Sequence, residues 1–462
     1  MIRTRHHQPS LWTGVLAEEV DDLWEPWMRT ADTLLDDEEL VGRIFEAQAR
    51  RFLKSRTRGR RQTPAEVVLR LLILKHVRAW SYEVLEREVR ANLVYRTFAR
   101  IGSEKVPDAK TLGRLGQVVG PDIVADLHRR MVEIAVENKV VAGKRMRVDT
   151  TVVETNIHYP TDSSLLGDGA RVLTRVLKKI EEAAGGRIGK VRNRMRAVRR
   201  KVLAIAIAAR QKGAAGEEKR RHIYKGLLSV TRKVVNAAKR VMGEVDGMAR
   251  RKSNELSGLR TQLATMVERV EQVIRQTQAR VFGGNTKFEA KLVSVFEPQT
   301  EIIRKGKASK PTEFGKLVKI QEAENQIVTH FEVYEERPTD SALLVEAVEI
   351  HQQQLGSIPH LVAADAGFYS QANEKQLKEM GVKNVSVPNR NTRSEERRLQ
   401  QKKRSFKRGQ RWRTGCEGRI SVLKRRHGLT RCLYRGLDGM KRWVGLGIIA
   451  DNLINIGLRL AN

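Results

Sequence analysis

The chain has 462 residues, enough for about two to four domains and a substantial core. It carries 88 Lys and Arg against 54 Asp and Glu, a formal net charge of +34, yet 40% of its residues are hydrophobic. This composition excludes a disordered basic tail protein. It indicates a folded protein whose partner is a polyanion, bound more weakly as the salt concentration rises.

Cysteine content and hydropathy indicate the cellular compartment of the protein. The two cysteines, Cys416 and Cys432, indicate a reducing compartment without a disulfide framework, and they are too few for a structural zinc site. The first residues resemble no signal peptide, and no apolar run reaches about 18 residues. We therefore expect a cytoplasmic protein without a membrane partner, in which the apolar tail from Trp443 to Leu460 is a packing helix.

The N-terminal part is predicted to be helical. Residues 1–58 form a partly helical segment, and residues 59–140 form an all-α domain. Thr63-Pro64-Ala65-Glu66 predicts a helix start, with Thr63 as the cap and Glu66 completing a capping box. Further helix starts are predicted at Ser81, Asp108 and Pro121. Short helices in a basic chain are typical of a helix-turn-helix-like DNA-binding module, although a bundle that only packs fits them equally well.

The periodicity changes to two at Lys144–Glu154, where Met146 and Val148 alternate with charged residues. This pattern predicts a strand. It places Asp149 within or at the end of that strand, where a carboxylate is costly unless something pairs with it. Shortly afterwards, Asp162 is predicted to cap a helix.

A long interlude, residues 163–283, has the pattern of a helical insertion. No proline occurs between Pro160 and Pro298. A heptad seam runs through Leu256, Leu259, Leu263, Met266, Val270 and Val273. We predict an antiparallel, coiled-coil-like hairpin or small bundle whose acid-free run Arg187–Lys201 holds DNA or a second subunit. A merely solvated charged face is the alternative.

Strand signals return after the insertion, at Lys291–Phe296, Leu317–Gln321, Val328–Tyr334, Leu361–Ala364 and Asn384–Val387. Thr339 or Asp340 is predicted to cap an intervening helix. The run Leu361–Ala364 has the apolar character of a strand buried on both faces, and it ends in Asp365, with a turn at Gly367. Carboxylates at the end of such a strand line the crevice where ligands bind. A last helix, Arg413–His427, carries Glu417.

Without the insertion, the order of elements is βββαβαβα, which predicts an RNase H-like mixed sheet built from residues 141–162 and 284–462. In that fold the first and fourth strands are neighbours, so Asp149 and Asp365 meet, and a later helix brings Glu417 to them. Three converging carboxylates supply hard oxygen ligands for two divalent cations, Mg²⁺ or Mn²⁺. Two such metals suit phosphodiester chemistry.

Five blocks carry a resemblance to a known family. They are Val148-Asp149-Thr-Thr-Val-Val-Glu-Thr-Asn, His158-Tyr-Pro-Thr-Asp-Ser, Arg304-Lys-Gly-Lys with Glu313-Phe-Gly, Ala364-Asp365-Ala-Gly-Phe-Tyr, and Glu417-Gly-Arg-Ile-Ser-Val-Leu-Lys-Arg-Arg-His-Gly-Leu. Over about residues 60–460 the chain resembles the DDE transposases of bacterial insertion sequences, which belong to the RNase H-like (retroviral integrase) superfamily. More narrowly, it is similar to the ISNCY-type elements.

This resemblance implies a metal-binding catalytic triad of Asp149, Asp365 and Glu417. The implied reaction is hydrolysis at the transposon ends, followed by attack of the freed 3′-hydroxyl on target DNA. The implied partners are double-stranded DNA, both element ends and target, and further copies of the chain on that DNA at the bacterial nucleoid. The size of the insertion departs from the family pattern.

Helical spacing places Lys424 on the same face as Glu417, where it is predicted to contact DNA phosphate. Other predicted DNA contacts are Arg419, Arg425, Arg426, Lys305 and Lys307. Two alternatives remain open at this stage: a stand-alone RNase H-like DNA nuclease without a joining step, and a domesticated, non-catalytic DNA-binding protein. Three carboxylates in a basic chain argue against the second alternative, because a binding module does not need them.

Overall fold

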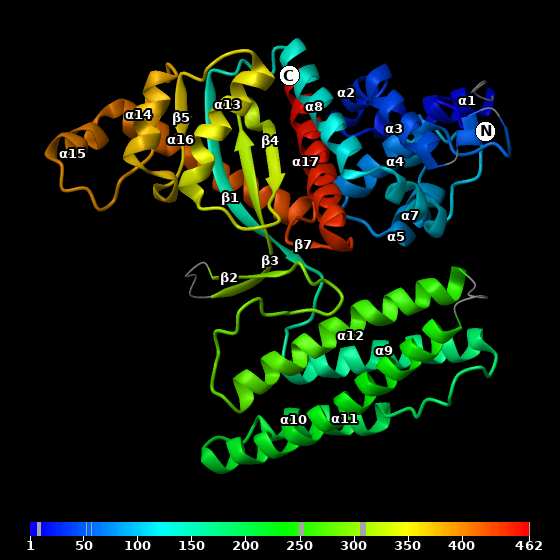
Figure 1. Cartoon of the computed structure of the whole chain (residues 1–462). Coiled ribbons are helices and arrows are strands. Elements are labelled where there is room, and N and C mark those ends of the chain that lie inside the picture. Colours follow the sequence, from blue (N-terminus) through cyan, green and yellow to red (C-terminus); the bar gives the residue numbers. More distant parts are fainter. Residues whose placement is uncertain (7–10, 52, 57, 249–253, 305–310, 462) are drawn as a thin grey trace. The chain divides into compact units, whose positions relative to one another are not determined.

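A computed structural model describes residues 1–6, 11–51, 53–56, 58–248, 254–304 and 311–461. The predicted contacts Lys305 and Lys307 lie outside the described residues. The chain divides into two compact units, which are described separately (Figure 1). Unit 1 comprises residues 1–156 and 303–462, and unit 2 comprises residues 157–302.

Unit 1 is built around a mixed sheet. Its strands are β1 (Arg145–Thr155), β3 (Thr312–Glu322), β4 (Val328–Val333), β5 (Leu361–Ala363) and β6 (Asn384–Ser386), with short β2 (Glu301–Arg304) and β7 (Arg431–Cys432). β1 pairs antiparallel with β3, and β3 pairs antiparallel with β4. On its other side β1 pairs parallel with β5, and β5 pairs parallel with β6. The prediction of a mixed α/β fold is therefore confirmed, as are four of the five predicted strands after the insertion.

Helices cover both faces of this sheet (Figure 1). Met146 and Val148 of β1 pack with α13 (Leu343–Leu355) and α14 (Gln371–Glu379). Val153, on the opposite face, packs with α16 (Arg404–Arg426) and α17 (Gly436–Leu460). This division follows from the alternation of side chains along a strand. It places Arg147 and Asp149 on the face that α16 covers. A short helix, α15 (Glu395–Lys402), precedes α16.

The N-terminal part of unit 1 is helical, as predicted. Its helices are α1 (Leu11–Glu19), α2 (Pro26–Leu34), α3 (Glu38–Arg51), α4 (Ala65–Val77), α5 (Tyr82–Ala91), α6 (Leu93–Phe98), α7 (Ala109–Val118) and α8 (Pro121–Glu137). α2 to α8 share one core with α17. By length and composition α17 could cross a membrane, but 72% of its apolar window is buried. It is a core helix, in agreement with its interpretation as a packing helix.

Two of the helix caps predicted from the sequence are present in the structure, and a third is not. Ser81 and Asp108 cap α5 and α7 by accepting hydrogen bonds from the backbone N–H groups of Val84 and Thr111. The predicted capping box at Thr63 is wrong. The first N–H groups of α4 donate instead to the backbone oxygens of Arg3 and Thr4. A chain segment distant in sequence thus takes the place of the local cap.

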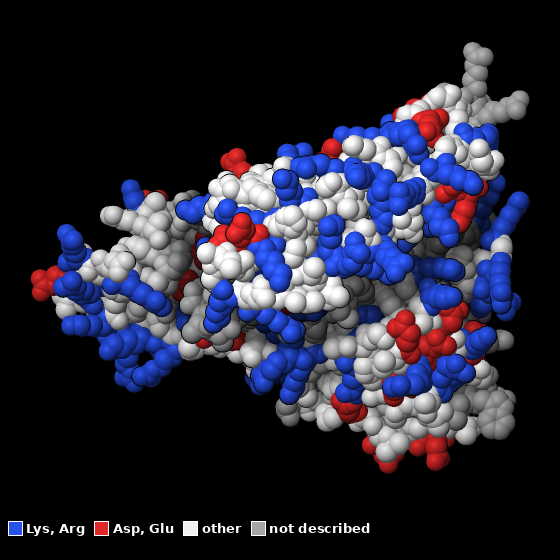
Figure 2. All heavy atoms as spheres, turned by 90° about the horizontal axis from the view of Figure 1, so that it is seen from below, with Lys and Arg blue, Asp and Glu red and all other residues white. Residues whose placement is uncertain are grey.

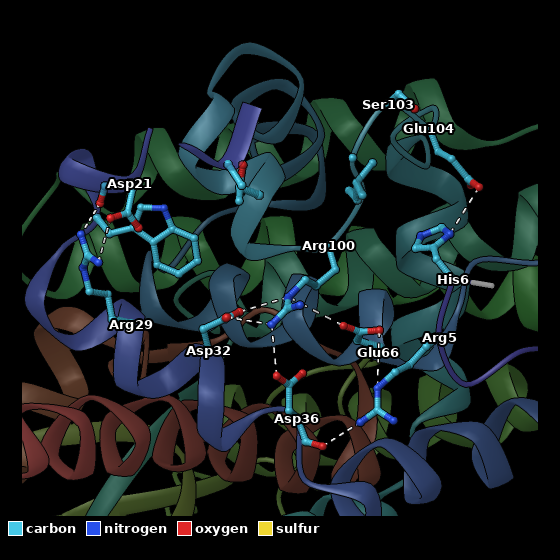
Figure 3. A pocket seen from close by; sticks show the side chains of 15 residues that line it. Arg5, His6, Asp21, Arg29, Asp32, Asp36, Glu66, Arg100, Ser103 and Glu104 are labelled. Carbon is cyan, nitrogen blue, oxygen red and sulfur yellow. Dashed lines mark hydrogen bonds and ion pairs between the residues drawn. The ribbon is translucent and has the colours of Figure 1, made fainter. Parts of the chain in front are cut away.

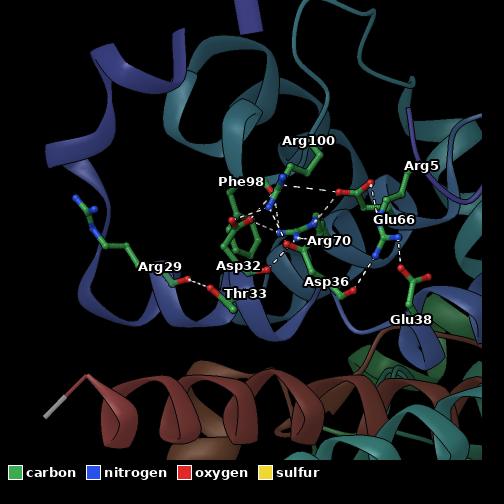
Figure 4. A network of polar contacts seen from close by, with 10 residues as sticks. All are labelled: Arg5, Arg29, Asp32, Thr33, Asp36, Glu38, Glu66, Arg70, Phe98 and Arg100. Carbon is green, nitrogen blue, oxygen red and sulfur yellow. Dashed lines mark hydrogen bonds and ion pairs between the residues drawn. The ribbon is translucent and has the colours of Figure 1, made fainter. Parts of the chain in front are cut away.

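Glu66 joins a buried network of charges in place of that box (Figure 4). The guanidinium of Arg70, which is fully buried, contacts Asp32, Asp36 and the backbone oxygen of Phe98. Burial is the largest influence on the Glu66 carboxyl and raises its pKa, although Arg70 lies 3.7 Å away. Removal of one partner from such a network is costly, because the remaining charge stays buried.

Lys75 of α4 is a second buried cation, only 2% exposed. Its Nζ lies 4.9 Å from the ring centroid of Tyr82, 5.1 Å from that of Tyr434 and 4.7 Å from that of Trp443. The aromatic faces attract the ammonium group. Burial nevertheless lowers the pKa of Lys75 to about 8.

We predict a pH-dependent stability from Lys75. Because its pKa is lower in the folded chain, the unfolded chain binds more protons between pH 8 and about 10.5, and the free energy of unfolding rises across that range. The gain is at most about 3 kcal/mol and should be missing in Lys75→Met. Chemical unfolding of both proteins at several pH values measures the difference. If the free energy of unfolding changes with pH in the same way for both proteins, Lys75 is not the source of the pH dependence.

Unit 2 contains α9 (Asp162–Ala184), α10 (Met195–Ala208), α11 (Ala214–Gly247) and α12 (Asn254–Val281). Five of the six residues of the predicted heptad seam are buried in its core, and Leu259 packs against it. The prediction of a helical insertion is confirmed. Asp162, however, does not cap α9: Thr161 does, and Asp162 pairs with Arg280.

The predicted strand at Lys291–Phe296 is wrong. This segment forms no strand, and side chains of α12 bond to its backbone instead. Gln276 accepts from the Leu292 N–H and donates to the Leu292 oxygen, and Arg269 donates to the Val295 oxygen. Leu292 and Val295 are buried in the core of unit 2.

Candidate active site

Two of the three predicted carboxylates lie on neighbouring strands. The parallel pairing of β1 with β5 places Arg145 opposite Leu361 and Arg147 opposite Ala363. Asp149 and Asp365 each follow two residues after the last of these pairs, so the ladder leads to both of them. Asp365 follows the end of β5, and its Oδ1 accepts a hydrogen bond of 2.8 Å from the Gly367 N–H. Neighbouring strands are about 4.8 Å apart, so the sheet brings the two chain segments that carry these carboxylates close to each other.

α16 brings the third carboxylate to the same face. Arg147 of β1 donates from Nε to Glu322 Oε2 at 2.9 Å and from Nη1 to the backbone oxygen of Trp412. Its guanidinium carbon lies 4.7 Å from the centroid of the Trp412 ring. Nearer the start of the helix, Gln410 donates to the backbone oxygens of Ala364 and Ser386. α16 is therefore fixed to β1, β5 and β6.

Arg413 lies between Asp149 and Glu417. Its guanidinium is 2.8 Å from Glu417 Oε1 and 3.8 Å from Asp149 Oδ2. The Asp149 side chain is 16% exposed, whereas that of Glu417 is 59% exposed. Arg413 thus supplies the counter-charge for both carboxylates. The sequence analysis missed this residue, although its position four residues before Glu417 on a helix is a recognisable signal.

The donors present suit a hard divalent cation, because they are carboxylates at a strand end. Among the described residues, however, no three His, Cys, Asp or Glu side chains form a group that could hold a metal ion. Asp149 and Asp365 follow the ends of the pairing between β1 and β5, while the Glu417 carboxylate pairs with Arg413. Of the predicted triad, the structure links Asp149 and Glu417 through Arg413, and the triad as a metal site stays a prediction.

Buried groups surround the site. Burial raises the pKa of the Glu322 carboxyl, and the neighbouring Arg147 acts against this effect. Burial also raises the pKa of the Cys416 thiol well above its usual value. Cys416 is thus an inert packing residue, as expected for a thiol kept protonated next to the carboxylates.

A fourth carboxylate, also missed by the sequence analysis, lies close by. Asp340 was predicted as a possible helix cap, but it makes no side-chain cap and instead accepts a 3.1 Å hydrogen bond from the Thr150 hydroxyl. Thr150 directly follows Asp149. No local sequence pattern indicates this contact, which joins residues 190 positions apart.

The predicted DNA contacts on α16 differ in their exposure to solvent. Arg419 is buried, and its Nη1 lies 2.6 Å from Asp451 Oδ1, so the structure argues against a DNA contact by Arg419. Arg425 and Arg426 are exposed, and Lys424 is half-buried on the same helix as Glu417. These three remain candidates for contact with phosphate.

A cavity of about 860 Å³ in unit 1 lies among the N-terminal helices and is lined by none of the four carboxylates (Figure 3). Its charged lining is already paired: Arg100 contacts Asp32 at 2.7 Å and Asp36 at 3.1 Å, and His6 contacts Glu104 at 3.3 Å. Five acids line the cavity beside three arginines and one histidine, and each acid contacts one of these bases. We therefore interpret this lining as part of the polar network that holds the helices together.

Two family models match the chain. One, described as a transposase domain (DUF772), matches residues 25–117, and the other, described as a transposase DDE domain, matches residues 372–456. The first match contains the buried Arg70 network, and the second contains Glu417 and all of α16. The chain is thus identified as a DDE transposase of the insertion-sequence type. No curated protein and no solved structure gives a significant match.

A transposase DDE domain implies an enzyme that cuts and rejoins DNA. The family also implies DNA binding, and DDE transposases generally use divalent metal ions. The narrower likeness of this transposase to ISNCY-type elements stays a prediction.

Two glycines of α16 give a matched test of how the helix is docked. A Cβ at Gly415 would collide with the Arg147 guanidinium, whereas a Cβ at Gly418 meets nothing within 4 Å. We expect Gly415→Ala to displace α16 and lower strand cleavage by about tenfold to a hundredfold. Gly418→Ala should retain cleavage and gain up to about 1 kcal/mol of stability.

Cleavage of labelled end DNA and chemical unfolding measure the two effects. Equal cleavage by the two variants would show that the contact between Arg147 and α16 does not set the position of Glu417.

Proposed function

We propose that this transposase binds the terminal inverted repeats of its element and catalyses metal-dependent strand cleavage and strand transfer. The observation that carries the proposal is that Asp149 and Asp365 both lie two residues beyond the last pair of β1 with β5, with Glu417 tied to Asp149 through Arg413. An RNase H-like catalytic domain is part of the proposal. It is supported by a central β1 with antiparallel neighbours on one side and parallel neighbours on the other.

In this proposal Asp149, Asp365 and Glu417 hold two Mg²⁺ ions, for which Mn²⁺ can substitute. When bound, such ions supply activation of the attacking oxygen and stabilisation of the leaving oxygen. The chain itself contributes position. The sheet fixes Asp149 and Asp365, α16 carries Glu417, and the Arg413 guanidinium limits the repulsion between neighbouring carboxylates.

The basic segment that leads into α16 is the surface we propose for DNA backbone contact. Between residues 388 and 411 the only acids are Glu395 and Glu396. The exposed cations there are Arg390, Arg393, Arg398, Lys402, Lys403, Arg404, Lys407, Arg408 and Arg411. Figure 2 shows Lys and Arg gathered at the left of the view, over the end of unit 1 that carries α15. Such a surface fits the phosphates of a duplex without reading its sequence.

Further contacts extend this proposal. Lys424 shares a helix face with Glu417 and would meet backbone next to the reacting phosphate. The N-terminal helical domain is proposed to bind the element ends.

Residues 157–302 contain 31 Lys and Arg against 14 Asp and Glu, a net +17, which is half of the charge of the whole chain. Unit 2 is therefore proposed to hold DNA, or a second subunit on DNA, within a homo-oligomeric assembly.

We predict that Asp149→Ala, Asp365→Ala and Glu417→Ala each lower cleavage of end DNA by at least about a hundredfold. DNA affinity should stay near that of the wild type, because no phosphate contact is lost. Asp438→Ala, which removes an exposed carboxylate from α17, is the control and should cleave normally. Cleavage and strand transfer are measured with labelled end DNA in Mg²⁺, and binding by titration without metal.

Substantial cleavage by one of the three variants would remove that residue from the triad. Cleavage without joining by the wild type would favour a stand-alone nuclease. Binding without cleavage would favour a non-catalytic DNA-binding protein.

The DNA surface is tested by two double variants that remove the same charge. Lys407→Ala/Arg411→Ala removes two exposed cations of α16. Lys375→Ala/Lys378→Ala removes two cations of α14 that pair with Glu379 and Glu374. We expect only the first to weaken binding and to lower the slope of log K against log salt by about two. Equal losses would show that net charge, not this surface, governs binding.

A further inference from the structure

The pairing of β1 with β5 ends before it reaches Asp149 and Asp365. Its last residue pair is Arg147 with Ala363, and Asp149 and Asp365 lie two residues beyond it. Asp149 itself is held by the ladder to β3, where it stands opposite Ile320. The turn that carries Asp365 has no ladder there. Something other than strand pairing has to keep this turn beside β1.

Asp340 lies close to both sides of this gap. It begins the 3-10 turn (Asp340–Ala342) before α13, and its Oδ1 accepts the 3.1 Å hydrogen bond from the Thr150 hydroxyl of β1. A Cβ at Gly367 would lie 3.1 Å from Asp340 Oδ2 and 3.1 Å from Asp365 Oδ1. The carboxylates of Asp340 and Asp365 therefore both lie next to Gly367.

The approach of Asp340 leaves the catalytic face open. Consecutive residues of a strand point to opposite faces, so Thr150 points away from the face on which Asp149 meets Arg413. Asp340 thus reaches the strand from the α13 side, while Arg413 reaches it from the α16 side. The two contacts do not compete for the same space.

We infer that Asp340 is a positioning residue, which fixes the Asp365 turn against β1 through the hydroxyl of Thr150. The inference rests on the proposed function, since it assumes that Asp149 and Asp365 share a divalent cation. It also gives Gly367 a role: a side chain there would press on both carboxylates. Asp340 acts through the hydrogen bond that it accepts, and an uncharged acceptor of the same shape can replace it.

The test is the affinity of the full-length protein for Mn²⁺, measured by calorimetry without DNA, with thermal unfolding of each metal-free variant alongside. We expect Asp340→Ala and Thr150→Val each to weaken Mn²⁺ binding by about tenfold, the size usual for residues that orient metal ligands. The double variant Asp340→Ala/Thr150→Val should be no weaker than either single variant, because both changes break the same hydrogen bond. Asp340→Asn keeps an acceptor oxygen and should bind Mn²⁺ within about threefold of the wild type.

Each other outcome overturns a defined part of this inference. Losses that multiply in the double variant would show that Asp340 and Thr150 act independently. Equal weakening by Asp340→Asn and Asp340→Ala would make the charge decisive, and the positioning role would be wrong. If the wild type binds Mn²⁺ and Asp340→Ala binds it equally well, the inference about Asp340 is wrong, but the metal site of the proposed function stands. A wild type that binds no Mn²⁺ overturns the metal site of the proposed function, and this inference with it.

Discussion

The geometry of the site depends on Arg147, a buried cation in the central strand. One edge of its guanidinium binds Glu322 of β3, and Nη1 reaches the backbone of Trp412 in α16. A buried guanidinium is tolerated only when its donors are satisfied, so the position of α16 follows from the position of β1. Gly415 allows the close approach, since any side chain there would collide with Arg147. The place of Glu417 on α16 thus depends on the contact of Arg147 with Trp412, and its carboxylate pairs with Arg413.

A single helix, α16, therefore positions the residues of the site relative to the sheet. Gln410 contacts the ends of β5 and β6, Trp412 contacts Arg147, and Arg413 contacts Asp149. These residues and Glu417 keep fixed spacings because a helix rises by about 1.5 Å per residue. The far end of α16 is held by the ion pair of Arg419 with Asp451 of α17. The hydrogen bond from Arg147 to the Trp412 backbone and the buried ion pair of Arg419 with Asp451 leave the helix little freedom to slide.

The sequence predicted what depends on local pattern, and it missed what depends on distant partners. Alternating residues predicted β1, and an apolar run that ends in a carboxylate and a glycine predicted the turn at Asp365. The predicted cap at Thr63 was wrong because the backbone oxygens of Arg3 and Thr4 accept the first hydrogen bonds of α4. The predicted strand at Lys291–Phe296 was wrong because the Gln276 side chain bonds to the backbone of Leu292. Asp340 could not be found from the sequence, since Thr150 lies 190 residues away. Arg413 had a local signal in its spacing to Glu417.

The same helix also links the charged surface to the site. Its first half carries exposed cations from Arg404 to Arg411, and Glu417 follows without a break in the helix. From Arg404 to Glu417 the axis advances by about 20 Å, a distance that the helix holds nearly constant. Phosphates held along the first half of α16 would thus stand at a fixed distance from the carboxylates. Because Arg147 sets where α16 lies, one buried contact governs the position of both Glu417 and the proposed DNA surface.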